Sequence, residues 1–107
     1  MAVKIIVLKQ CQKEILDFPD EVRGDLADLL AQLDLGLMLS MPISRPMPSI
    51  GKGVHELRLK DVSGIYRVIY VFVAQNNVWL IHGFKKTTQQ TPHKNIELAK
   101  KRLKEVL

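Results

Sequence analysis

The stretch VHELRLKDVSGIYRVIYVFVAQNNVWLIHGF, residues 54–84, decides the fold of this 107-residue chain. Residues 54–60 alternate apolar with polar side chains, and residues 64–74 and 77–84 are apolar nearly throughout, which is typical of strands. The segments DVSG and QNN supply the turn residues between these runs. We therefore predict an antiparallel meander of three strands joined by tight hairpins.

The segments before the meander predict one strand and two helices. Residues 3–9, VKIIVLK, have the β-branched content of a strand. A helix is predicted from Phe18, with Pro19 in its first turn and Gly36 at its stop, and a shorter helical turn at residues 10–16 would form a helical hairpin with it. The longer helix carries one apolar stripe that must pack on something, formed by Val22, Leu26, Leu29, Leu30 and Leu33.

The chain ends in a third predicted helix, which starts at Pro92 and has Thr91 as its N-cap. Its apolar seam consists of Ile96, Ala99, Leu103 and Val106. Together these elements predict an α+β fold, with an N-terminal strand and helical hairpin, a meander that joins the first strand in one sheet, and a C-terminal helix. A chain of this length has room for one core, so residues 1–107 are expected to form a single domain.

Positive charge is concentrated in the second half of the chain. The net charge is +5, but residues 1–50 hold five Lys/Arg and seven Asp/Glu, whereas residues 51–107 hold eleven and four. The first half therefore carries −2 and the second +7. This asymmetry suggests that one face of the protein meets a polyanion such as nucleic acid.

Cysteine usage and the first residues bear on the cellular compartment. Cys11 is the only cysteine, so no intrachain disulfide can form, and a lone thiol of this kind is expected to be a buried apolar residue. The opening MAVKIIVLK has an apolar run of only four residues between its lysines, which is too short for a signal peptide or a membrane span. We expect a cytoplasmic protein without a membrane partner.

Residues 36–53, GLMLSMPISRPMPSIGKG, combine Pro, Gly and Met without a sustained periodicity. Such a long irregular segment is uncommon in a small domain and is often a binding element. Two interpretations stay open: a crossover whose Met and Leu side chains cap the core, or a surface that moulds itself to a protein partner.

Arg67 is the anomaly of the second strand. It shares a face with the aliphatic residues Ile65, Ile69 and Val71, and arginine is rarely buried unless it is paired. One interpretation is a structural ion pair with Glu56 or another carboxylate. The other is a guanidinium held by the sheet for a phosphate, whose oxygens its planar fork fits.

Three more cations are expected near Arg67. Arg58 lies on the preceding strand, and Lys85 and Lys86 follow the next one, so all four would converge, because adjacent strands lie about 5 Å apart. Such a cluster is the size of a phosphate. The Thr and Gln residues that follow, 87–91, are either a polar linker or contacts to nucleic acid.

Other chemistry has little support in the sequence. His82 on the third strand is a candidate general acid or base, although a half-buried structural role is the commoner one. His55 and His93 have no visible partner. No Cys/His spacing fits a zinc site and no glycine-rich loop precedes a helix, so we expect no metal and no small-molecule cofactor.

The segments ELRLK, GIYRVIYVF, HGFKKTTQQTP and ELAKKRLKE resemble the Gp49/HigB-like branch of the RelE/ParE toxin superfamily. The resemblance covers nearly the whole chain in element order and is most specific from Glu56 to Leu103. It implies a RelE-like toxin of a type II toxin–antitoxin system, a ribosome-dependent mRNA endoribonuclease (mRNA interferase) that inhibits translation. The implied partners are the ribosome, mRNA and a helix-turn-helix (HigA-like) antitoxin.

The resemblance also implies a metal-independent mechanism, in which the ribose 2′-hydroxyl attacks the adjacent phosphate and cations stabilise the developing charge. The catalytic residues expected from it are Arg58, Arg67 and Lys85, with His82 as a further candidate. RNA-binding residues are expected at Lys60, Lys86, Lys94 and Lys101. Several relatives have a Tyr, His or Asp shortly after the position of Phe84, where this chain has none, so the base and acid stay open between His82, Tyr66 and Lys85.

Two other classes of function stay open. The same fold hosts ParE-like toxins that poison DNA gyrase through a protein surface, and it can also serve as a non-catalytic module that binds nucleic acid or protein. Binding to RNA through phosphates would weaken steeply with salt, whereas a flat salt response would indicate a protein target.

Overall fold

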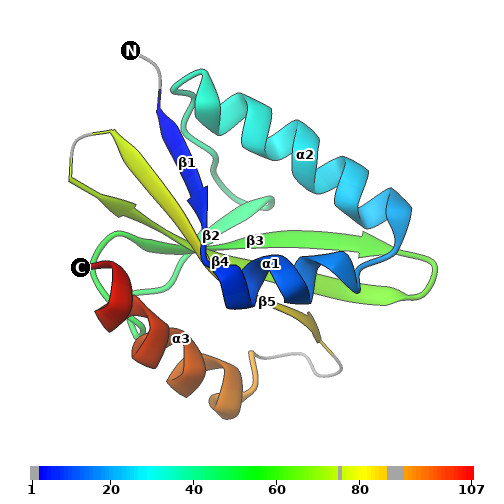
Figure 1. The fold of residues 1–107 in the computed structure, drawn as a ribbon. Helices are drawn as coiled ribbons and strands as arrows, with labels where there is room; N and C mark the ends of the chain where they lie inside the picture. The colour runs from blue at the N-terminus through cyan, green and yellow to red at the C-terminus, as the bar shows by residue number, and fades with distance from the viewer. Residues whose placement is uncertain (1–2, 75, 87–90) are drawn as a thin grey trace.

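The computed structural model describes residues 3–74, 76–86 and 91–107 (Figure 1). Its elements, in chain order, are β1 (Lys4–Val7), α1 (Lys9–Leu16), α2 (Asp20–Asp34), β2 (Ser44–Pro46), β3 (Val54–Asp61), β4 (Gly64–Val73), β5 (Asn77–Lys86) and α3 (His93–Val106). The predicted α+β fold is confirmed. None of the described helices is long and apolar enough to cross a membrane.

The five strands form one sheet in the order β1-β5-β4-β3-β2. The predicted antiparallel meander is β3-β4-β5, and β1 joins it by pairing in parallel with β5. The short edge strand β2 was not predicted, because Ser44–Pro46 has no periodicity and ends in a proline. This strand forms because it pairs antiparallel with residues 55–57 of β3 and not because of its own sequence.

Helices cover both faces of the sheet: α1 and α2 lie on one side, and α3 lies on the other (Figure 1). Tyr66 and Val68 pack in the core beneath α1 and α2, whereas Ile69 and Val71 pack beneath α3. The predicted alternation of β4 is therefore confirmed. This alternation also places Arg67 on the α3 face.

A β-bulge reverses the alternation partway along β5. Tyr70 pairs with Leu80 and Ile69 pairs with His82, so Ile81 is the extra residue. Val78 and Leu80 lie in the core beneath α1 and α2. Beyond the bulge, the even-numbered residues of β5, such as Phe84, lie beneath α3 instead of beneath α1 and α2. This reversal decides which lysine at the end of β5 can meet Arg67.

The apolar stripe of α2 and its predicted stop are confirmed. Four of the five predicted residues are buried and Leu30 is partly buried. Gly36 has a φ of +86°, its N–H donates to Leu33 O at 2.9 Å, and Leu37 N–H donates to Gln32 O at 3.0 Å. This pair of bonds is a Schellman motif, which favours glycine at the left-handed position.

Helix α3 starts differently from the prediction. Pro92 occupies the N-cap position without a side-chain cap, so the prediction of Thr91 as the N-cap is wrong. The Thr91 hydroxyl instead donates a hydrogen bond of 2.6 Å to Glu56 Oε2. The predicted apolar seam of α3 is confirmed, with Ala99 and Leu103 buried and Ile96 and Val106 partly buried against the same core.

Cys11 is a core residue, as expected. It is fully buried on α1, and burial raises the pKa of its thiol to about 12, with Glu14 adding to the shift. The thiolate is therefore not populated near neutral pH, and Cys11 contributes packing rather than chemistry.

Candidate functional site

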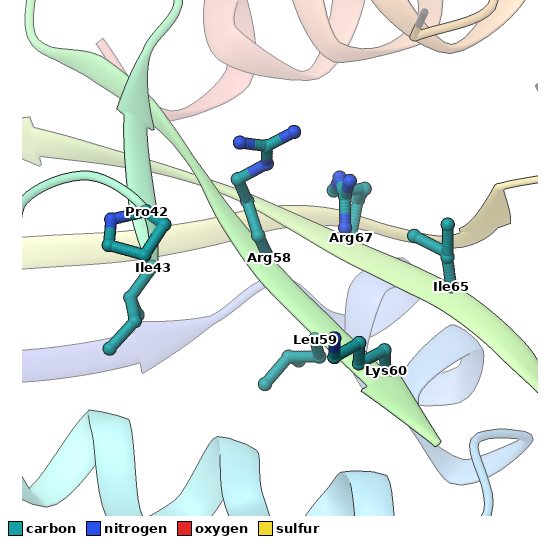
Figure 2. A pocket seen from close by; sticks show the side chains of 7 residues that line it. All are labelled: Pro42, Ile43, Arg58, Leu59, Lys60, Ile65 and Arg67. Carbon is teal, nitrogen blue, oxygen red and sulfur yellow. The ribbon is translucent and has the colours of Figure 1, made fainter. Parts of the chain in front are cut away.

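Arg58 and Arg67 face each other at paired positions of the β3–β4 ladder. Arg58 N–H points away from β4 and donates to Ile43 O at 2.8 Å. The two arginines thus form a non-hydrogen-bonded pair, the kind in which opposing side chains are closest. Like charges directly opposite each other destabilise a sheet. The fold therefore holds two guanidinium groups together against their repulsion (Figure 2).

Arg67 is nearly buried, with 6% of its surface exposed, and its neutralising partner is Glu56, which is 1% exposed. Arg67 Nε lies 3.3 Å from Glu56 Oε1, and Nη1 donates to Tyr66 O at 3.2 Å. The structural ion pair considered for Arg67 is thus present. Burial lowers the pKa of Arg67, Glu56 opposes this shift, and Arg58 adds to it.

One glutamate does not satisfy both arginines. The contact between Arg67 Nε and Glu56 is short enough for an ion pair, but its N–H is not aligned for a hydrogen bond. Within the described part of the chain, Arg67 Nε and Arg58 Nε are buried and have no hydrogen-bond acceptor. One carboxylate leaves one of the two positive charges unbalanced, so this pair is suited to an anion that accepts from the Nη groups of both arginines.

Lys86 joins the arginine pair from β5. It pairs with Ile65 in the ladder and is 6% exposed. Burial lowers the pKa of Lys86, and Arg67 is the next largest cause. Glu56 opposes the shift, while Arg58 and Arg45 add to it. We call Arg45, Arg58, Arg67 and Lys86, which surround Glu56, the cation cluster.

Two members of the cation cluster, Arg58 and Arg67, line a hollow of about 370 Å³ (Figure 2). The lining combines three cations with an apolar wall and consists of Pro42, Ile43, Arg58, Leu59, Lys60, Ile65 and Arg67. The volume falls within the range of small-molecule sites, about 300–1,000 Å³. A phosphate with part of its nucleotide would fit this combination of charge and apolar surface.

Lys85 does not join the cluster, contrary to the predicted convergence. Its Nζ lies 5.8 Å from the centre of the Tyr66 ring, on the face that α1 and α2 cover. There it lines a second hollow together with Glu14 and Asp17 of the helical hairpin. The bulge in β5 is the cause, because it turns Lys86 toward Arg67 and Lys85 away. The Tyr66 hydroxyl is also on that face, 2.8 Å from Ser63 Oγ.

His82 lies on the α3 face but in a separate polar network. It is 3% exposed, its Nε2 lies 2.7 Å from Asn95 Oδ1, and its Nδ1 lies 3.1 Å from Glu14 Oε1 and 3.2 Å from Arg102 Nη1. Both ring nitrogens are therefore occupied by residues of α1 and α3. Arg102 also binds Glu14 through both guanidinium ends, at 2.7 and 3.1 Å. This network joins α1, β5 and α3.

The remaining predicted RNA-binding lysines are exposed but lie in different places. Lys60 lines the hollow beside the arginine pair. Lys94 and Lys101 lie on the solvent side of α3 and do not line it. The structure thus brings Arg58, Arg67, Lys86 and Lys60 together and leaves Lys85, His82, Lys94 and Lys101 outside.

Two members of the site were not predicted. Arg45 belongs to the irregular segment, and it reaches the cluster because β2 sets it opposite Glu56 in the ladder. Thr91 was predicted as a helix cap and not as a partner of Glu56. The sequence offers no signal for either contact, since both depend on how distant segments dock.

Two structures of the E. coli RelE toxin share this fold. One is a doubly arginine-to-alanine-substituted form in the free state, 17% identical over 100% of both chains with a TM-score of 0.69. The other is the isolated toxin, 20% identical over 99% of this chain and 100% of that one, with a TM-score of 0.59. The architecture is therefore that of RelE.

The family follows from the sequence model that this chain matches. Residues 13–104 match the model of the phage-derived Gp49-like proteins, so the chain belongs to the Gp49-like family. A comparison with curated protein sequences gave no significant match. The resemblance seen in the sequence to a Gp49/HigB-like toxin with the RelE fold is confirmed at the level of family and fold.

Proposed function

We propose that this protein is the toxin of a type II toxin–antitoxin system and acts as a ribosome-dependent mRNA endoribonuclease. The observation that carries the proposal is the Arg58–Arg67 pair, two facing cations that line one hollow and of which only Arg67 has a carboxylate partner among the described residues. RNA supplies a second anion at every phosphate. The Gp49-like family and the RelE fold support the same class of protein.

The chemistry proposed needs a phosphate, its 2′-hydroxyl and positioned cations. The 2′-oxygen attacks phosphorus while its proton passes to water, the bond from phosphorus to the 5′-oxygen breaks, and a 2′,3′-cyclic phosphate remains. Arg58 and Arg67 would bind the oxygens on which negative charge develops, an effect typically worth about 10² to 10³ in rate. Lys86, whose pKa is lowered by burial and by Arg67, is the proposed proton donor to the leaving 5′-oxygen.

This assignment revises the candidates for acid and base. Lys86 takes the place proposed for Lys85, because it lies in the cation cluster. His82 is proposed as a structural residue, since both of its ring nitrogens already have partners. Glu56 is proposed as a positioning residue that holds the Arg67 guanidinium in place through the contact at Nε.

An antitoxin is the proposed protein partner, with a helix-turn-helix domain as in HigA-like proteins. Residues 35–43 carry a row of exposed apolar side chains, formed by Leu35, Leu37, Met38, Met41 and Ile43. A row of this kind favours a protein contact over plain solvent exposure. Because Ile43 also lines the hollow, a partner bound along this row would lie beside the cation cluster.

Induced expression in growing bacteria tests the proposal. Cells that express the parent protein should stop incorporating labelled amino acids while plasmid supercoiling stays normal. Arg67→Ala should be harmless, and Arg23→Ala, which removes an arginine of the acidic helix α2, should stay toxic. Loss of supercoiling with continued protein synthesis would instead indicate a gyrase-poisoning toxin.

A further inference from the structure

Strand β3 has an open edge directly beside the arginine pair. On this side β2 pairs only with residues 55–57, and Arg58 N–H bonds to Ile43 O. Along this edge, no strand of the described chain pairs with β3 beyond that point. Because main-chain direction alternates along a strand, Lys60, two residues on, also directs its N–H and C=O outward. Among the described residues, this donor and this acceptor have no hydrogen-bond partner, so the edge offers both to a ligand.

Two hollows meet along this edge. The hollow of about 370 Å³ reaches Arg67 and Ile65, and a neighbouring one of about 390 Å³ reaches Asp25 and Asp28 of α2. Both are lined by Ile43, Arg58, Leu59 and Lys60. The two hollows therefore adjoin at this edge, and we call them together the β3-edge groove, with the guanidinium pair at one end and two carboxylates at the other.

The two ends of the groove demand opposite chemistry. At one end, Arg58 and Arg67 line the hollow and offer guanidinium donors to an anion. At the other, the side chains of Asp25 and Asp28 are exposed and, among the described residues, form no ion pair. Ionised carboxylates only accept hydrogen bonds. A ligand that fits must carry an anion at one end and N–H donors at the other, with a flat apolar body between.

We propose that the β3-edge groove is a nucleotide subsite that selects bases with an exocyclic amino group. The phosphate binds Arg58 and Arg67, the base lies against Ile43 and the main chain of Lys60, and its amino group donates to Asp25 or Asp28. Cytosine, adenine and guanine carry such a group, and carboxylates accept from it in base recognition. At that position uracil presents a carbonyl oxygen, which cannot donate a hydrogen bond to a carboxylate.

An added peptide strand fits the groove less well. An acidic segment would suit the arginines but would be repelled by the carboxylates, and a basic segment would meet the reverse problem. A nucleotide joins an anion and an amino donor in one small ligand. The proposal rests on the proposed function for its source of nucleotide, which is RNA.

Cytidine and uridine monophosphates provide the test, because they differ only in the base. We would titrate each, and inorganic phosphate, into the ¹⁵N-labelled full-length protein and follow the guanidinium Nε–H and amide signals by NMR. All three should shift Arg58 and Arg67. Only the cytidine nucleotide should also shift the amides of Lys60 and Asp28, and it should bind several-fold more tightly than the uridine nucleotide.

The variants separate base selection from phosphate binding. Asp25→Asn/Asp28→Asn should abolish the difference between the two nucleotides, whereas Asp34→Asn, on the same helix but outside the groove, should keep it. Equal binding of both nucleotides by the parent would overturn the subsite and leave the proposed function standing. If none of the three ligands shifts the arginines, the proposed function itself is contradicted. A stronger shift of Lys60 by an acidic peptide would make the groove a peptide site and overturn the proposal.

Discussion

Thr91 and Glu56, 35 residues apart in the sequence, are joined by a hydrogen bond of 2.6 Å. The same carboxylate neutralises Arg67 through its other oxygen. The start of α3 is thereby fastened to the centre of the cation cluster. The position of α3 and the position of the Arg67 guanidinium are therefore coupled through the buried Glu56.

Removing the Thr91 hydroxyl should loosen this coupling. A hydrogen bond to a charged group contributes about 1.5–3 kcal/mol, so Thr91→Val should lower the free energy of unfolding by that order and reduce toxicity. Thr91→Ser keeps the hydroxyl and should behave much like the parent. Urea denaturation of the three proteins measures the effect, and equal midpoints for Val and Ser would refute the coupling.

The Glu56–Arg67 pair should show a conflict between stability and function. Glu56→Gln leaves Arg67 buried without a countercharge, which typically costs about 3–5 kcal/mol. Adding Arg67→Met should recover part of that loss in urea denaturation while toxicity stays absent. A double variant less stable than Glu56→Gln would show that Arg67 has another neutralising partner.

Glu14 should make the protein sensitive to acid. Burial raises the pKa of its carboxyl, but hydrogen bonds from His82, Arg102 and Gly83 outweigh burial and lower the pKa from 4.5 to about 2. The folded state therefore gains stability above pH 4.5 that it loses as the pH falls toward 2, about 3 kcal/mol at most. Denaturation at pH 6 and pH 3 should show part of this loss in the parent and a smaller one in Glu14→Gln. The control Glu105→Gln, an exposed residue of α3, should follow the parent.

Lys86 should control the alkaline limb of RNA cleavage. Its pKa lies below the usual value of 10.5, so Lys86 loses its proton at a lower pH than an exposed lysine does. Lys86→Arg keeps the charge at high pH but does not give up a proton. We expect this variant to cleave more slowly and to lose the alkaline limb. Lys85→Arg should retain the pH profile of the parent. If Lys85→Arg alone changes that profile, the role of proton donor belongs to Lys85.

Much of the fold could be predicted from local patterns. The alternation of Tyr66, Val68 and Tyr70 with Arg67 and Ile69, and the helical stripe of α2, are periodic signals that depend only on neighbours in sequence. The isolation of Arg67 among aliphatic residues is a local signal too, and it points to the centre of the candidate site from the sequence alone. None of these features depends on long-range docking.

The remainder of the site depends on packing that the sequence does not display. The bulge at Ile81 lies within a run of apolar residues and has no mark in the sequence. It nevertheless decides that Lys86 and not Lys85 meets Arg67. Arg45 enters through a three-residue edge strand. Glu14 and Arg102, 88 residues apart, meet only because α1 and α3 both pack near the bulged part of β5.

The most direct test of the central claim is to map the 5′ ends of a reporter mRNA during in vitro translation with the purified protein. We predict cuts that appear only on translated mRNA, disappear with Arg67→Ala and remain with Arg23→Ala. Intact mRNA in the presence of the parent protein, or unchanged cleavage by Arg67→Ala, would contradict the claim that the Arg58–Arg67 pair acts on the RNA phosphate.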